Sequence, residues 1–102
     1  MATLHTVNKS PFANQSLLSC LAHAKDGDTV LMIEDGVYGA ASGTGLADAM
    51  VAMASRVALV ALQPDLNARG IAAARLLDGI KTTDYAGFVE LAASHDRTQA
   101  WL

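Results

Sequence analysis

The sequence is poor in cysteine, proline and aromatic residues, and it has little charge of either sign. One cysteine excludes a disulfide within the chain. No apolar run reaches the roughly 20 residues that a membrane-spanning helix needs, so we expect no transmembrane segment. The seven basic residues are scattered and the net charge is −3, which argues against direct nucleic-acid binding. The first ten residues lack a charged and apolar leader pattern, which predicts a cytoplasmic protein.

What is present is a large share of small apolar residues. Hydrophobic residues make up 52% of the 102 positions, and only 17% are charged, so much of the surface must be apolar. Large exposed apolar patches are unusual in soluble monomers and mark interfaces. We therefore expect a single domain spanning residues 1–102 that associates with other chains.

Short apolar runs alternate with helical patterns along the chain. Residues 71–83 stay open, because 71–77 has a helix-forming composition whereas 79–83 could be a short strand. Parallel strands need crossover connections, so the alternation predicts an α/β fold. The expected strands are 2–7, 29–33 and 57–62; the expected helices are 11–24, 46–54 and 85–94, the last capped by Asp84, with one helical turn at 63–70.

The single cysteine, Cys20, falls within the first expected helix. Leu17, Leu18 and Leu21 form its apolar side, which places Cys20 at the edge of that side, where a partner could reach its thiol. His23, three residues further on, would favour a thiolate if protonated. The alternative is an inert, packed cysteine, since free cysteine is among the most buried residue types and the later half of a helix disfavours an anion.

Other candidate sites are weaker. His5, Cys20 and His23 suggest a metal site, and the i,i+3 spacing of Cys20 and His23 permits two ligands on one helix face. The sequence supplies no clear third and fourth ligand, so we expect no metal and no cofactor. His5 alternates with Leu4 and Thr6 in the first expected strand, which favours a hydrogen-bonded histidine near the sheet end. The turn ASGTG (41–45) precedes a helix but lacks the Lys-Ser/Thr of a P-loop, which favours a plain connection. Trp101 is the residue best suited to an interface, because a tryptophan near a chain end needs something to pack against.

Two charged pairs have ordinary interpretations. Glu34 and Asp35 follow an expected strand, where α/β folds place ligand contacts, but a solvated or interface-facing turn is favoured. Asp65 and Arg69 stand four residues apart on a helical turn and can pair with each other.

Several stretches together resemble the DsrH/TusB family of sulfur-relay subunits. These stretches cover the chain in order: LHTVNKSPF, LLSCL, IEDGVYGA, LQPDLNARG, DYAGFVEL and TQAWL. Within this family, the presence of Cys20 and the long match at HTVNKSPF make the chain more similar to the DsrH branch than to the TusB branch. The resemblance implies a small three-layer α/β domain of the DsrE/DsrF/DsrH type, with a mostly parallel sheet of about four to five strands covered by helices on both faces.

The resemblance also implies partners and a function. It implies a dimer of heterotrimers with DsrE/TusD-like and DsrF/TusC-like subunits, passing persulfide sulfur to or from DsrC/TusE-like and TusA-like carriers. The pathway would be intracellular sulfur oxidation or 2-thiolation of the tRNA wobble uridine. The principal acceptor cysteine would lie on the DsrE/TusD-like partner, leaving Cys20 as a secondary persulfide site.

Two other hypotheses remain beside this one. The chain could be a non-catalytic subunit that completes the complex and its carrier-docking surface. It could also be a standalone flavodoxin-like or receiver-like binding protein, which would predict a stable monomer.

Overall fold

A computed structural model describes residues 2–102 and contains eleven elements. The five strands are β1 (Thr3–Val7), β2 (Thr29–Met32), β3 (Ala58–Leu62), β4 (Ile80–Thr83) and β5 (Arg97–Trp101). The four α-helices are α1 (Ser16–His23), α2 (Ala47–Met53), α3 (Gln63–Ala68) and α4 (Tyr85–Ser94), and two 3-10 helices are η1 (Glu34–Ala40) and η2 (Ala73–Arg75). Within the described residues, no helix is both long and apolar enough for a bilayer crossing.

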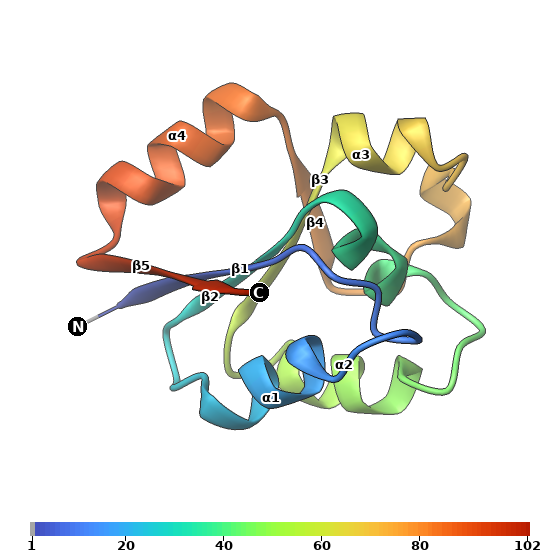
Figure 1. Cartoon of the computed structure of the whole chain (residues 1–102), viewed down its shortest axis with the longest axis horizontal. Helices are drawn as coiled ribbons and strands as arrows, with labels where there is room; N and C mark the ends of the chain where they lie inside the picture. The colour runs from blue at the N-terminus through green and yellow to red at the C-terminus, as the bar shows by residue number, and fades with distance from the viewer. Residues whose placement is uncertain (1) are drawn as a thin grey trace.

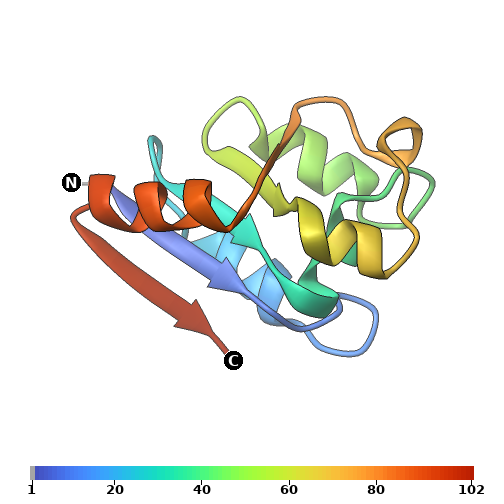
Figure 2. The ribbon, with the colours of Figure 1, turned by 90° about the horizontal axis from the view of Figure 1, so that it is seen from above.

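The strands form one parallel sheet in the order β4-β3-β2-β1-β5. Helices α1 and α2 cover one face and α4 lies on the other, while α3 lies beyond the end of β3 (Figures 1 and 2). The last connection runs from β4 at one edge to β5 at the opposite edge, and α4 carries it across the sheet. The predicted α/β class with a parallel sheet is confirmed.

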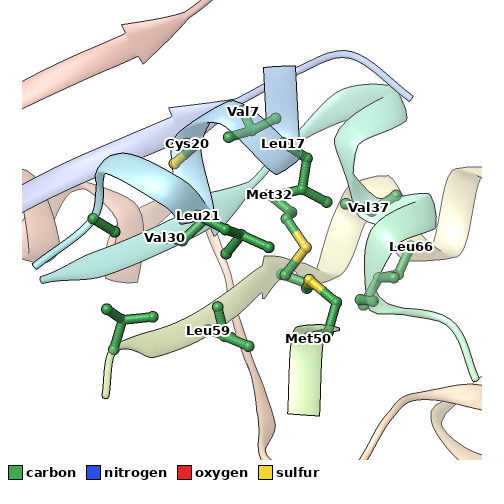
Figure 3. Close-up of a cluster of buried hydrophobic side chains, with 14 residues drawn as sticks. Val7, Leu17, Cys20, Leu21, Val30, Met32, Val37, Met50, Leu59 and Leu66 are labelled. Atoms are coloured by element: carbon green, nitrogen blue, oxygen red, sulfur yellow. The ribbon is translucent and has the colours of Figure 1, made fainter. Parts of the chain in front are cut away.

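The core is unequally divided between the two faces of the sheet. The larger cluster lies under α1 and α2 and includes Cys20, Met32 and Met50 (Figure 3). The face under α4 buries only Leu4, Leu31 and Val60, with Phe88 and Leu91 partly buried against them. Successive side chains of a strand point to opposite faces of the sheet. In β1, Leu4 therefore points to the face under α4, and His5 points to the face under α1 and α2.

The 3-10 helix η1 lies directly against the end of β1. The amide of Ile33 donates a hydrogen bond to the Val7 oxygen at 3.0 Å. A Cβ atom on Gly36 would overlap that same Val7 oxygen, so only glycine allows this approach. Glu34 begins η1 with a φ of 49°, the one left-handed non-glycine residue found within residues 2–102.

The structure differs from the sequence-based prediction at the start of α1 and near the C-terminus, and it settles the conformation of residues 71–83. Helix α1 begins at Ser16 rather than near Pro11, and residues 11–13 form a turn before it. Residues 71–83, which were left open, contain the short helix η2 and then strand β4. Residues 97–101, to which no element was assigned, form the edge strand β5 beside β1.

Candidate functional site

Cys20 lies in the core and not at the edge of the apolar side of α1, so the predicted boundary position is wrong. The residues that α1 buries are Leu17, Cys20 and Leu21, with Ala24 just after its end, whereas Leu18 is 41% exposed. This set follows the i, i+3, i+4, i+7 spacing of a helix face. Figure 3 shows the thiol on the inner side of α1, near Val7. Solvent does not reach Cys20 in this conformation.

Its surroundings make the Cys20 thiol a poor nucleophile. Burial raises the pKa of Cys20 to about 12, and the negative charge of Asp28 adds to the rise. The reactive form of cysteine is the thiolate. At neutral pH the folded chain therefore holds Cys20 as a neutral thiol.

Asp28 is the centre of a hydrogen-bonded cluster beside Cys20. Its carboxylate accepts from the Thr3 amide at 3.0 Å, the Lys25 amide at 3.0 Å and the His5 ring at 2.9 Å. Burial opposes ionisation of this carboxyl, but the three donors outweigh burial and lower the pKa of Asp28 to about 2. Asp28 is thus a buried carboxylate at the start of β2.

His5 joins Asp28 to the C-terminal strand. The Trp101 indole N–H donates to His5 Nδ1 at 3.0 Å, while His5 Nε2 lies 2.9 Å from Asp28. An indole nitrogen is only a donor, so Nδ1 must accept, and the ring proton is therefore on Nε2, which donates to Asp28. The prediction of a hydrogen-bonded His5 is confirmed, and the geometry assigns one neutral tautomer.

Trp101 finds its packing partners within the chain. Its ring lies 6.1 Å from the His5 ring and 5.4 Å from the His23 ring, measured between centroids. His23 is exposed and its Nδ1 lies 2.9 Å from the Ser19 oxygen, one turn earlier in α1. The side chain assigned from sequence to an interface is therefore held between β1 and α1 of its own chain.

An open cavity of about 520 Å³ adjoins the Asp28 cluster. Its lining includes His5, His23 and Asp28, together with Lys25 and Arg97. The structure therefore brings His5 and His23 to one cavity, while Cys20 lies beneath α1 and does not line it. Among residues 2–102, no three His, Cys, Asp or Glu side chains gather in a metal-binding group.

The acidic residues after β2 have a partner that the sequence analysis missed. Asp35 accepts from Arg69 Nε at 2.9 Å, whereas the predicted Asp65–Arg69 pair is longer, at 3.8 Å. Asp65 also accepts from the Glu34 amide at 2.6 Å. Arg69 therefore ties η1 to α3 at the carboxyl end of the sheet, so the turn is braced rather than merely solvated.

Sequence reasoning also missed Asp28, which lies between the first expected helix and the strand expected at 29–33. Its only signal was its position, one residue before the wholly buried strand β2. The pairing of β1 with β2, which brings the Thr3 amide to Asp28, depends on strand order and is not encoded locally.

The fold places this chain in a class of small α/β proteins that has solved representatives. The crystal structure of the ychN protein from E. coli superposes with a TM-score of 0.82 at 15% identity, covering 98% of this chain and 99% of that one. The protein of unknown function MTH1491 from Methanobacterium thermoautotrophicum has a TM-score of 0.73 at 15% identity, covering 91% of each chain. At these identities the likeness establishes the fold.

Sequence comparison identifies the family. Residues 9–98 match the model of the DsrH like protein family. The chain is 33% identical to protein TusB of Pectobacterium parmentieri over 98 residues, which are 96% of this chain and 99% of that protein. It is 32% identical to protein TusB of Escherichia coli O81 (strain ED1a) over the same coverage. The chain belongs to the DsrH/TusB family.

Proposed function

We propose that this chain is a subunit of a cytoplasmic, heterohexameric sulfur-relay complex that passes persulfide sulfur between carrier proteins. The observation that carries the proposal is similarity to the TusB proteins over 96% of the chain, together with the DsrH family match over residues 9–98. Its partners would be DsrE/TusD-like and DsrF/TusC-like subunits, and its carriers DsrC/TusE-like and TusA-like proteins. The sulfur would serve intracellular sulfur oxidation or tRNA wobble-uridine thiolation.

Persulfide transfer sets clear requirements for any participating cysteine. The acceptor thiolate attacks the terminal sulfur of a donor persulfide, a new S–S bond forms, the old one breaks, and the donor leaves as a thiolate. No external oxidant is consumed. The acceptor must therefore be ionised and reachable at the moment of attack.

Cys20 is the only position at which this chain itself could hold persulfide sulfur. Its burial and its pKa of about 12 mean that α1 must first open, because burial is the main cause of the raised pKa and the Asp28 charge only adds to it. We assign the first acceptor to a cysteine of the DsrE/TusD-like partner. Cys20 would then be a secondary site that operates only after docking has exposed it.

A purely structural role is the second candidate, and the complete burial of Cys20 favours it. The exposed large apolar side chains provide contact area for partners: Phe12, Leu18, Val51, Tyr85, Val89 and Leu102. In this role the chain would complete the complex and shape the surface on which a carrier docks.

The test is intact-protein mass spectrometry of the co-expressed complex after exposure to a persulfide donor. Wild type is compared with Cys20→Ser and with Cys20→Ala, which avoids burying a hydroxyl. Sulfur gained by this chain in the wild type alone, about 32 Da per atom, would establish Cys20 as a carrier. If only a partner gains sulfur, and the complexes with wild type, Cys20→Ser and Cys20→Ala all stay intact, this chain has the structural role.

Two further outcomes bear on the proposal as a whole. A complex in which no subunit gains sulfur would contradict the relay function. A chain that stays monomeric and never co-purifies with the other two subunits would point instead to a standalone binding protein. Alkylation of Cys20 in the folded complex, timed against the denatured chain, measures whether assembly exposes the thiol.

A further inference from the structure

A second cavity, of about 330 Å³, lies away from Cys20 and is lined by residues from four separate segments. It lies beside the turn that leads into α2 and the segment that follows α3. Two arginines line it and no acidic residue does. The lining consists of Phe12, Tyr38, Ala41, Ser42, Gly43, Thr44, Arg69, Gly70, Ile71 and Arg75.

Arg69 is fixed in place at this cavity. Its Nε donates to Asp35 at 2.9 Å and its Nη1 donates to the Asp65 backbone oxygen at 3.3 Å. A guanidinium carries five N–H donors. Because these two bonds use Nε and Nη1, the N–H groups of Nη2 stay available to a ligand. The side chain is 22% exposed. Arg69 is therefore a preorganised donor whose orientation costs little when a ligand arrives.

Arg75 supplies the uncompensated positive charge. Its backbone is tied to the turn, because its oxygen accepts from the Ser42 amide at 2.6 Å and Leu76 forms a bridge with Ala41. Its exposed side chain makes no hydrogen bond or ion pair with any residue from 2 to 102. Arg75 thus keeps its full donor capacity for a ligand.

The remaining polar groups of the lining are also suited to an anion. Ser42, Thr44 and Tyr38 bring hydroxyl groups, which can donate to an oxyanion. The aromatic rings of Tyr38 and Phe12 supply an apolar wall, and Phe12 is 60% exposed.

We propose that this cavity binds a small organic phosphate, with the phosphoryl group between Arg75 and the turn 42–44 and a planar organic part against Phe12 and Tyr38. Arginine and hydroxyl donors match a phosphate dianion better than a monoanionic carboxylate, because more oxygens and more charge are available. The volume exceeds that of an inorganic anion and falls within the range of small-ligand sites. The site is distinct from Cys20 and does not depend on sulfur transfer.

The test is ligand-detected NMR titration of the full chain with phenyl phosphate, inorganic phosphate and phenol. We expect saturable binding of phenyl phosphate in the millimolar range or tighter, with both fragments at least about fivefold weaker. Arg75→Gln should weaken phenyl phosphate binding about tenfold or more, the effect of one lost charge-assisted contact. Arg56→Gln is the matched control, since Arg56 is exposed and pairs with Asp26, outside this cavity.

Three results would overturn the proposal. The first is the absence of saturable phenyl phosphate binding. The second is equal weakening by Arg75→Gln and Arg56→Gln, which would mark general charge attraction. The third is equal affinity for inorganic phosphate, which would remove the role of the aromatic wall. Because Arg75 has no internal partner, its substitution leaves the fold intact, and the amide spectrum of the variant verifies this directly.

Discussion

At the scale of single residues, Asp28, His5 and Trp101 form a row of directed hydrogen bonds. Each bond fixes the direction of the next, because the indole can only donate and the carboxylate can only accept. These three residues join the middle of β1 and the residue before β2 to the end of β5. Removal of any member leaves a buried polar group without a partner, which costs more than the bond itself contributes.

Trp101→Phe tests the last bond of this row. Phenylalanine keeps an aromatic ring between His5 and His23 but lacks the N–H that satisfies His5 Nδ1. We expect the free energy of unfolding to fall by about 1 to 2 kcal/mol. Urea titration followed by circular dichroism measures the free energy of unfolding. Tryptophan fluorescence cannot be used, because Trp101 is the only tryptophan and the variant lacks it.

Tyr85→Phe is the control for this substitution. Tyr85 is 59% exposed and its hydroxyl has no partner among the described residues, so its change should stay within about 0.5 kcal/mol. Equal effects of the two substitutions would mean that the indole hydrogen bond contributes nothing measurable.

Cys20 shows how far the sequence predicted the site. The helix and its apolar side were predicted, but the face was centred on three leucines, and this placed Cys20 at its edge. Including Ala24 completes the 17, 20, 21, 24 spacing and moves Cys20 to the middle, with Leu18 outside. Two of the three donors to Asp28 could not be predicted, because the Thr3 amide and the His5 ring belong to a strand 25 and 23 residues earlier.

At the scale of elements, η1 depends on one glycine where it crosses the end of β1. In Gly36→Ala the new methyl group would overlap the Val7 backbone oxygen, and backbone atoms cannot rotate away as a side chain can. We expect the free energy of unfolding to fall by about 3 kcal/mol or more. Denaturant unfolding of the variant against wild type measures the loss.

Gly45→Ala is the matched control, because a Cβ at Gly45 meets nothing within 4 Å and its φ is not in the left-handed region. A neutral or slightly stabilising effect is expected there, from the reduced freedom of the unfolded chain. A Gly36 variant as stable as the Gly45 variant would show that η1 does not need the close approach.

Helix α4 depends on its N-cap more than the other helices do. It buries no residue completely, so packing contributes little to holding it. The Asp84 side chain accepts from the Gly87 amide at 2.8 Å, as the sequence predicted. Asp84→Ala should lower the free energy of unfolding by about 1 kcal/mol.

Asp78→Ala provides the comparison for Asp84→Ala. Asp78 is exposed and its side chain makes no hydrogen bond or ion pair within residues 2–102, so its loss should change stability by less than about 0.5 kcal/mol. If the two variants unfold at the same denaturant concentration, the cap does not stabilise α4.

The elements that were predicted well and those that were missed differ in a physical way. Strands β2 and β3 are almost entirely buried and appear as continuous apolar runs in the sequence. Strand β5 carries Arg97, Thr98 and Gln99, is mostly exposed, and gains its strand conformation from pairing with β1. Its pattern resembles a polar tail, because the partner strand lies more than 90 residues away in sequence.

At the scale of the whole molecule, the strand order explains which features lie beyond local prediction. The chain steps outward from β1 to β4 and then returns to place β5 on the other side of β1. The stretches at the two ends of the sequence, LHTV and TQAWL, therefore lie side by side in parallel register. Alternation of strands and helices predicts the α/β class, but the direction of each crossover depends on the total packing of the sheet.

The Asp28 cluster also makes the stability of the whole fold dependent on pH. The pKa of Asp28 is lowered from 3.8 to about 2, so the folded state prefers the ionised carboxyl more than the unfolded state does. This preference contributes about 2 kcal/mol above pH 4 and is lost as the pH falls through the folded pKa near 2. Asp28→Asn should therefore be less stable than wild type at pH 6, and the difference should shrink steadily between pH 4 and pH 2.

Unfolding free energies from urea titrations at several pH values between 2 and 6 measure this difference. Asp26→Asn is the control, because Asp26 is 77% exposed and its pair with Arg56 is solvated, so its effect should be small at every pH. A deficit of Asp28→Asn that is the same at pH 2 and pH 6 would mean that its cause is lost packing or geometry. A deficit that disappears in acid ties the stability of the sheet to the charge of this one buried carboxylate.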